Sequence, residues 1–252
     1  MTSKFIIGCN HIGSHTDIPP KVIEYLNSGN FVWVEHKEEL MIDIDLLGIK
    51  DLTNYKVFTD HTLEEQIEQT RHLLESGKDV MLLTHMGYPG TADPGSDLIK
   101  HIRLMGFEIE IIAGPSIAPL AVALSGITQS ERGYLVRETF SNELIEIDSY
   151  LENIKDIYEL LVFIDFNHKI TDIISSMLKV FKEDREACII LNAGLKNQSV
   201  ISGKYTDILA EIDSYPKSRV KKILRYGQDP EEIDIPKIFI GALMTIVSKG
   251  KP

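Results

Sequence analysis

Residues 82–126 read LLTHMGYPGTADPGSDLIKHIRLMGFEIEIIAGPSIAPLAVALSG. The segment begins at the end of an apolar run, passes through a loop rich in glycine and proline, and then shows helical spacing of apolar residues at 98–105. A strand at 108–112 leads into a second such loop, AGPS at 113–116, and a helix of small residues. Strands that alternate with helices in this way lie parallel, and ligands bind beyond their carboxyl ends. The segment therefore predicts two ligand-binding loops on one sheet.

The composition of these loops supports the same interpretation. The first contains Gly87, Tyr88, Pro89 and Gly90, and it closes with the triplet DPG at 93–95. Glycine allows backbone to approach a ligand closely, and proline stiffens a loop so that less entropy is lost on binding. One such loop is equally typical of an ordinary turn between a strand and a helix. Two in register, together with the triplet, favour a binding site.

Length and charge limit the function classes. The chain has 252 residues, 43% hydrophobic and 25% charged, as expected for a folded protein of one large or two small domains. A net charge of -12 disfavours broad, non-specific nucleic-acid binding, which depends on neutralising phosphates. One local basic run remains, and this pattern is more typical of a solvated helix face than of a binding site. Its members are Lys217, Arg219, Lys221, Lys222 and Arg225.

Several kinds of site find no support in the sequence. Cys9 and Cys188 lie far apart in apolar surroundings, which predicts reduced core residues. The eight histidines are scattered, none at metal-ligand spacing with cysteine or carboxylate, so we expect no metal. Neither a Walker A loop nor a dinucleotide-binding glycine fingerprint is present. No apolar stretch approaches the ~18 residues of a membrane span, and we expect a cytoplasmic protein.

Further elements can be placed outward from the central segment. A helix at 63–76 is expected to end at Gly77, and the polar stretch 128–133 is the candidate linker. We therefore expect an N-terminal domain at 1–128 and a C-terminal domain at 134–252. The other predicted strands lie at 5–8, 31–34, 160–164, 187–191, 200–203 and 237–243.

The two loops resemble the signature region of the tetrapyrrole methylase superfamily of S-adenosylmethionine-dependent methyltransferases. Within it they are most similar to the branch of ribosomal RNA small subunit methyltransferase I, whose first loop reads roughly D-A-G-T-P-x-x-x-D-P-G and whose second reads P-G-P-S/C. In this chain, HMGYPGTADPG at 85–95 keeps the glycine, the proline and the closing triplet at the same spacing. His85 stands in place of the acid, and Tyr88 in place of the threonine.

The resemblance extends over nearly the whole chain. EHK at 35–37 stands where the branch has E-D-T-R, and DH at 60–61 where it has D-H-N-E. DFNHK at 165–169 and NAGLK at 192–196 stand where the branch has E-S-P-H-R and A-R-E-L-T-K. Gly194 replaces the glutamate of the branch and resembles the tetrapyrrole enzymes, and the usual R-K-G-E before the last strand is absent.

The resemblance implies two α/β domains of the tetrapyrrole methylase type, with S-adenosylmethionine bound in the cleft between them. A cationic, zwitterionic ligand suits an acidic protein and a site built mainly of backbone groups. Tyr88 is a candidate to stack on the adenine or to lie over the sulfonium, although a partly buried loop aromatic is equally ordinary. The cofactor-binding residues carried over by position are Ile12, Gly87, Tyr88, Pro89, Ala92, Ser116, Ile117, Asp165, Ala193 and Gly194.

Methyl transfer is an in-line displacement, so the protein mainly aligns the two reactants and accepts a proton from the acceptor. His168 and Lys169, beside Asp165, are the first candidates for this proton transfer, and Glu35 follows. A His-Lys pair at a junction between a strand and a helix is also typical of a solvated cap. Both interpretations stay open at this point.

The function implied is methyl transfer to an RNA ribose 2'-hydroxyl. The same fold methylates tetrapyrrole carbons and peptide nitrogens, and Gly194, the acidic charge and the missing R-K-G-E favour that alternative. A member that binds cofactor or a partner without catalysis is the third possibility, because the first loop is altered at His85 and Tyr88. Relatives of this type are usually homodimers, and we expect the same here.

Overall fold

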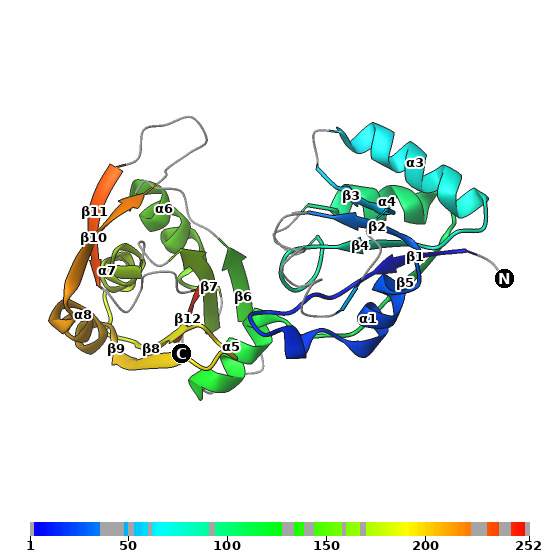
Figure 1. The fold of residues 1–252 in the computed structure, drawn as a ribbon. Helices are drawn as coiled ribbons and strands as arrows, with labels where there is room; N and C mark the ends of the chain where they lie inside the picture. Colours follow the sequence, from blue (N-terminus) through cyan, green and yellow to red (C-terminus); the bar gives the residue numbers. More distant parts are fainter. Residues whose placement is uncertain are drawn as a thin grey trace. The chain divides into compact units, whose positions relative to one another are not determined.

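The computed structural model places two compact units, Met1–Ser116 and Ile117–Pro252. Each unit has its own five-stranded sheet with helices packed on it, which confirms the predicted α/β class (Figure 1). The structure describes residues 3–35, 48–49, 53–59, 62–90, 94–127, 134–138, 144–157, 160–166, 170–222, 231–236 and 243–249.

The first unit contains a sheet of order β3-β2-β4-β1-β5 in which every neighbouring pair is parallel. Its strands are β1 (Lys4–Ile7), β2 (Phe31–Val34), β3 (Tyr55–Val57), β4 (Val80–Leu83) and β5 (Glu108–Ile111). Its helices are η1 (His15–Asp17), α1 (Pro20–Leu26), α3 (Leu63–Glu75) and α4 (Ser96–Leu104). β2 and β4 read FVWV and VMLL and are buried throughout, as expected for parallel strands covered on both faces.

Successive residues of β1 show how the two faces are covered. Ile6 belongs to a core cluster with Val22 of α1, whereas Phe5 belongs to a second cluster with Leu74 of α3 and Ile102 of α4. Because side chains alternate along a strand, α1 therefore packs on one face of the sheet and α3 and α4 on the other. Helix α3 is followed by Gly77 with a positive φ of 82°, as the sequence predicted.

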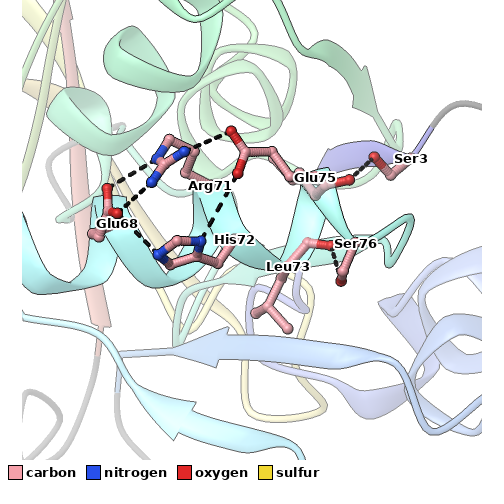
Figure 2. Close-up of polar contacts among 8 residues, drawn as sticks. Ser3, Glu68, Arg71, His72, Leu73, Glu75 and Ser76 are labelled. Atoms are coloured by element: carbon pink, nitrogen blue, oxygen red, sulfur yellow. Dashed lines mark hydrogen bonds and ion pairs between the residues drawn. The ribbon is translucent and has the colours of Figure 1, made fainter.

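The solvent face of α3 carries a group of charged residues one helical turn apart. The guanidinium of Arg71 pairs with the carboxylates of Glu68 and Glu75, and His72 lies between the same two carboxylates (Figure 2). The hydrogen bond from Arg71 lowers the pKa of Glu68. Such exposed pairs at i,i+3 and i,i+4 support the helix weakly. Ser3 ties the chain start to this helix by donating to the Leu74 carbonyl at 2.5 Å.

The second unit contains a mixed sheet of order β6-β7-β12-β8-β9. Its strands are β6 (Tyr134–Glu138), β7 (Leu160–Phe166), β8 (Glu186–Leu191), β9 (Ser199–Lys204) and β12 (Leu243–Lys249). Its helices are α5 (Ile117–Ser125), α6 (Leu144–Ile154), α7 (Ile170–Phe181) and α8 (Tyr205–Ser214). The last three helices share one core cluster with one face of the sheet, and α5 packs on the other face.

The boundary between the units differs from the one expected at 128–133. Helix α5 belongs to the second unit, because its buried Ala118 and Ala121 pack with Val162 of β7 and Ile190 of β8. The helix that follows β5 thus covers the sheet that comes after it in the chain rather than the sheet before it. The stretch 128–133 itself lies outside the residues that the structure describes.

Four residues of the basic run expected on a helix face, those at 217–222, lie instead on a strand, and Arg225 lies outside the described residues. β10 (Lys217–Lys222) pairs antiparallel with β11 (Glu231–Pro236) in a separate two-stranded sheet. The register sets Arg219 opposite Asp234 and Lys221 opposite Glu232. The sequence prediction failed because the partner strand comes later in the chain. Of the final strand predicted at 237–243, residues 237–242 lie outside the described residues, and β12 begins at Leu243.

Two further findings concern expectations from composition. Among the residues that the structure describes, no helix is both long and apolar enough to span a membrane. Cys9 and Cys188 are both free and buried, as the sequence predicted.

Neither thiol should react in the native protein. Burial raises the pKa of both Cys9 and Cys188 to about 11. At about pH 8 the reactive thiolate is then roughly a thousandth of each population, and burial also restricts access. Titration with Ellman's reagent is expected to detect almost no thiol in the native protein and both thiols in guanidinium chloride. Rapid reaction of one thiol without denaturant would contradict the buried placement.

Candidate functional site

Three loops gather at the carboxyl edge of the first sheet. They follow β1, β4 and β5, which are neighbours in the order β4-β1-β5. We call residues 8–14 the first loop, residues 84–90 the second loop and residues 112–116 the third loop. Because parallel strands end at the same edge, the sheet itself brings these loops together.

The first and second loops are joined through their backbones. The Asn10 N–H donates to the Gly87 carbonyl at 2.8 Å, and the Gly87 N–H donates to the His11 carbonyl at 3.1 Å. Gly87 has a φ of 66°, a left-handed conformation that glycine adopts without strain. The predicted glycine therefore serves a backbone role at the site.

A buried side chain, Asn10, reinforces this junction. Its amide nitrogen donates to the carbonyls of Thr84 at 3.1 Å and His85 at 2.8 Å, while its oxygen accepts from the His11 N–H at 2.8 Å. Sequence analysis did not single out this residue. A polar amide in the short loop after a buried strand was the available signal, since a buried amide must be satisfied by hydrogen bonds.

The third loop is held by Tyr88 and Cys9. The Tyr88 hydroxyl accepts from the Gly114 N–H at 2.6 Å and donates to the Gly114 carbonyl at 3.3 Å. Burial raises the pKa of Tyr88, which keeps the hydroxyl protonated as a donor. Cys9 donates from its sulfur to the Pro115 carbonyl at 3.2 Å. Tyr88 thus connects the second and third loops, whereas its predicted contact with a cofactor stays a prediction.

Glu35 lies beside the second loop. Its carboxylate accepts a hydrogen bond from the His85 N–H at 3.3 Å. The His85 ring lies 6.3 Å from the ring of His11, centroid to centroid, and His11 lies 5.2 Å from His15. The Gly13 N–H donates to Nδ1 of His11 at 3.1 Å, so a neutral His11 carries its proton on Nε2. The predicted acid and three imidazoles therefore adjoin the same loops.

The other predicted residues of the first unit fall on the same three loops. Ile12 and Pro89 are buried in the first and second loops, and Ser116 ends the third. The glycine of the DPG triplet, Gly95, directly precedes α4 with a φ of 125°, and a Cβ there would lie 2.7 Å from the Leu82 side chain. Ala92 lies outside the residues that the structure describes.

In the second unit, the backbone of Asp165 and the loop after β8 lie at one edge of the sheet. β7 and β8 are both antiparallel to β12, so they are parallel to each other. Met244 of β12 pairs with Asp165 on one side and with Leu191 on the other. Asp165 and Leu191 are thus level and roughly 10 Å apart, two strand spacings. Ala193 and Gly194 follow directly after β8.

The loop after β8 is a tight turn. Asn192 and Gly194 have φ values of 52° and 79°, and the Gly194 N–H donates to the Gln198 side-chain carbonyl at 3.0 Å. Ala193 is buried in a core cluster, and Ile117, the first residue of α5, packs against the same cluster and is partly buried. The structure therefore brings Ile117, Ala193 and Gly194 together, while His168 and Lys169 lie outside the described residues.

The two groups of residues offer mainly backbone donors and acceptors. Within the described part of the chain, no cluster of three His, Cys, Asp or Glu side chains is arranged to hold a metal ion. The backbone is accessible at Gly87 and Gly194, and it is closely packed at Gly114. Such sites suit a small ligand with several polar groups, held by preformed loops.

Comparison with known proteins agrees with this arrangement. A sequence model of the Tetrapyrrole (Corrin/Porphyrin) Methylases matches residues 12–209. Ribosomal RNA small subunit methyltransferase I of Thermotoga maritima is 25% identical over 213 residues, which make up 83% of this chain and 92% of that protein. The protein of the same name from Bacillus subtilis is 22% identical, over 88% of this chain and 75% of its own.

Solved structures show the same fold. Diphthine synthase matches with a TM-score of 0.62 and 17% identity, covering 98% of this chain and 90% of its own. Uroporphyrin-III-C-methyltransferase from Thermus thermophilus matches with a TM-score of 0.59 and 15% identity, covering 98% and 94%. At these identities the likeness concerns the fold alone.

Proposed function

The chain belongs to the tetrapyrrole (corrin/porphyrin) methylase family, and from this membership we propose that it methylates ribosomal RNA at a ribose 2'-hydroxyl with S-adenosylmethionine as donor. The proposal of this acceptor rests on the relatives named ribosomal RNA small subunit methyltransferase I, several of which cover most of this chain. The structural observation that supports the proposed donor is the joined set of three loops at residues 8–14, 84–90 and 112–116.

These loops fit the donor. S-adenosylmethionine supplies a methyl group activated by a sulfonium, and its amino acid and nucleoside parts need many neutral hydrogen-bonding partners. Gly114 packs so closely on Cys9 that a Cβ would lie 2.6 Å from the sulfur. This close contact restricts the conformation of the third loop. Preformed loops lower the entropy lost on binding. In the first unit we assign contacts to Ile12, Gly87, Tyr88, Pro89 and Ser116, with Ala92 kept as a prediction.

In the second unit we assign the remaining contacts to Ile117, Asp165, Ala193 and Gly194. Asp165 is the second-to-last residue of β7 and is level with Leu191 at the end of β8, and Ala193 and Gly194 occupy the turn after β8. Both positions present backbone at a sheet edge, where ligands of α/β proteins bind.

The residues of this chain contribute alignment and proton transfer. The acceptor oxygen takes the methyl group as the carbon–sulfur bond breaks, and the hydroxyl proton passes to a base. Glu35 is held beside the second loop by the His85 N–H and is one candidate for this base. His168 and Lys169, which lie outside the described residues, remain the other candidates.

Gly194 favours a second candidate function, methylation of a tetrapyrrole or a peptide. It replaces the glutamate of the ribosomal RNA branch and adopts a φ of 79°, a conformation that disfavours a larger residue. Transfer of labelled methyl groups to small ribosomal subunits, a precorrin and a peptide acceptor distinguishes the two. We expect labelling of the ribosomal RNA, and labelling of only a precorrin or a peptide would overturn this acceptor.

The donor is tested first by calorimetric titration with S-adenosylmethionine and S-adenosylhomocysteine. Pro89 is buried in the second loop, so Pro89→Trp should displace that loop and abolish binding. Pro216→Trp is the matched control, because Pro216 is exposed between α8 and β10, and it should bind as the wild type does. Failure of the folded wild type to bind either compound would favour the third possibility, a member without catalysis.

We also propose that the protein acts as a homodimer in the cytoplasm, where ribosomal RNA is found. Light scattering at micromolar concentration tests the first part. A monomeric mass would contradict it.

A further inference from the structure

Asn10 is placed where two loops of the proposed cofactor site meet. It lies three residues after the end of β1 at Ile7, and only 2% of its surface is exposed. Its side-chain amide makes three hydrogen bonds, two donated to the second loop and one accepted from its own loop. Both carbonyl partners, of Thr84 and His85, lie in the stretch that turns from β4 toward Gly87.

These bonds continue the contacts between the ends of β1 and β4. The Gly8 N–H donates to the Leu82 carbonyl at 2.9 Å, and farther along the Asn10 side chain donates to the carbonyls of Thr84 and His85. The Asn10 amide satisfies both carbonyls at once. Buried carbonyl groups left without a donor are costly, so the amide favours one conformation of the second loop.

The conformation that Asn10 favours is also the one that fixes Gly87 and Tyr88. Gly87 exchanges two backbone hydrogen bonds with Asn10 and His11, and the Tyr88 hydroxyl then bonds Gly114 of the third loop. A substitution of Asn10 is therefore expected to change the conformation of all three loops, because the contacts that join them are adjacent. We propose that Asn10 is a positioning residue that preforms the cofactor-binding loops, an inference that rests on the proposed function.

Asn10→Asp is the sharpest variant, because it keeps the shape and the oxygen that accepts from His11. The ionised carboxylate has no proton to donate, and its second oxygen would face the Thr84 and His85 carbonyls. At about pH 8 we expect the affinity for S-adenosylhomocysteine to fall on the order of tenfold or more, the usual effect of an unmatched buried polar group.

Lowering the pH should partly restore binding in this variant alone. Burial and two facing carbonyl oxygens disfavour the charged carboxylate, so the pKa of Asp at this position should lie above the usual ~4. Below that raised pKa the carboxyl is protonated and again donates one hydrogen bond. The other ionisable side chains on or beside these loops, His11, His15, His85 and Glu35, are the same in the variant and in the wild type. The ratio of variant to wild-type affinity at each pH is therefore the quantity measured.

Asn54→Asp is the matched control. The Asn54 amide also joins two loops, because it donates to the Gly29 carbonyl at 2.6 Å, but these loops precede β3 and β2 at the amino edge of the same sheet. The chemical change is identical and the position is remote from the three loops. Its affinity for S-adenosylhomocysteine should equal that of the wild type at every pH.

The measurements are calorimetric affinity from about pH 8 to about pH 6, circular dichroism, and steady-state kinetics. A positioning role predicts a raised KM for S-adenosylmethionine in Asn10→Asp, a nearly unchanged kcat at saturation, and recovery of affinity at low pH. If Asn10→Asp fails to fold, Asn10→Ser retains one hydroxyl donor and should bind with intermediate affinity. Wild-type affinity in the folded variant, or a loss of affinity equal to that of Asn54→Asp, would overturn this inference alone. A wild type that binds neither compound would instead overturn the proposed function.

Discussion

Replacing Gly114 with alanine should abolish detectable cofactor binding and lower the free energy of unfolding by about 1–3 kcal/mol, the usual effect of overpacking a close contact. A Cβ at this position would lie 2.6 Å from the Cys9 sulfur, 2.7 Å from the Cys9 Cβ and 2.8 Å from Cγ of Pro19. A Cβ atom and a proline ring cannot rotate away as the end of a flexible side chain can. The first and third loops must therefore separate, and the bond from Gly114 to Tyr88 is lost with them.

Gly106→Ala separates this effect from a general loss of stability. Gly106 has a φ of 82° and nothing within 4 Å of an added Cβ, so alanine there is strained by its backbone but displaces no neighbour. We expect about 1 kcal/mol of destabilisation and unchanged cofactor affinity. Calorimetry and urea unfolding of both variants make the comparison. Normal affinity in a folded Gly114→Ala variant would show that the third loop is not part of the site.

The strands of the first sheet could be predicted from the sequence because the residues within each strand are sufficient to identify it. Runs such as FVWV at 31–34 and VMLL at 80–83 are apolar throughout, and a parallel strand buried on both faces requires this pattern. The loops after them were recognisable by glycine and proline. The strand order of the sheet then places these loops side by side, so the loops of the candidate site could be predicted from local patterns, whereas their neighbours could not.

The misplaced boundary and the basic hairpin depended on contacts that the sequence does not reveal locally. The polar stretch at 128–133 resembles a linker, yet α5 contributes Ala118 and Ala121 to the second core. The basic residues of β10 pair with a strand that begins at Glu231, and their spacing alone does not identify that partner. Asn10 was overlooked for a similar reason, since its three partners include two carbonyls more than seventy residues away in sequence.

The second unit has its own core, and Phe163 is one of its most buried side chains. It is 1% exposed on β7 and pairs in register with Ile246 of β12 and Arg137 of β6. Truncation to alanine removes an aromatic ring from a close-packed cluster, so Phe163→Ala should lower the free energy of unfolding by about 3–5 kcal/mol. For a domain of this size the melting temperature should fall by roughly 10 °C or more.

A single tryptophan allows the two units to be followed separately. Trp33 belongs to the first unit, where it is 2% exposed, donates to the Thr70 hydroxyl at 2.9 Å and contacts the ring of Phe31. Its fluorescence therefore reports unfolding of the first core, whereas far-ultraviolet circular dichroism reports both units. Because each unit encloses its own clusters, we expect Phe163→Ala to shift the circular dichroism transition and to leave the Trp33 transition in place.

Val200→Ala is the control for this experiment, because Val200 is 42% exposed on the edge strand β9 and its truncation should change stability by no more than about 0.5 kcal/mol. If Phe163→Ala moved the Trp33 transition as far as the circular dichroism transition, the two units would unfold as one cooperative structure. Cofactor titration of Phe163→Ala at temperatures below and between the two transitions tests the contacts proposed for the second unit. If Asp165, Ala193 and Gly194 bind the cofactor as proposed, affinity should fall at the temperature where the second unit melts, while Trp33 still reports a native first unit.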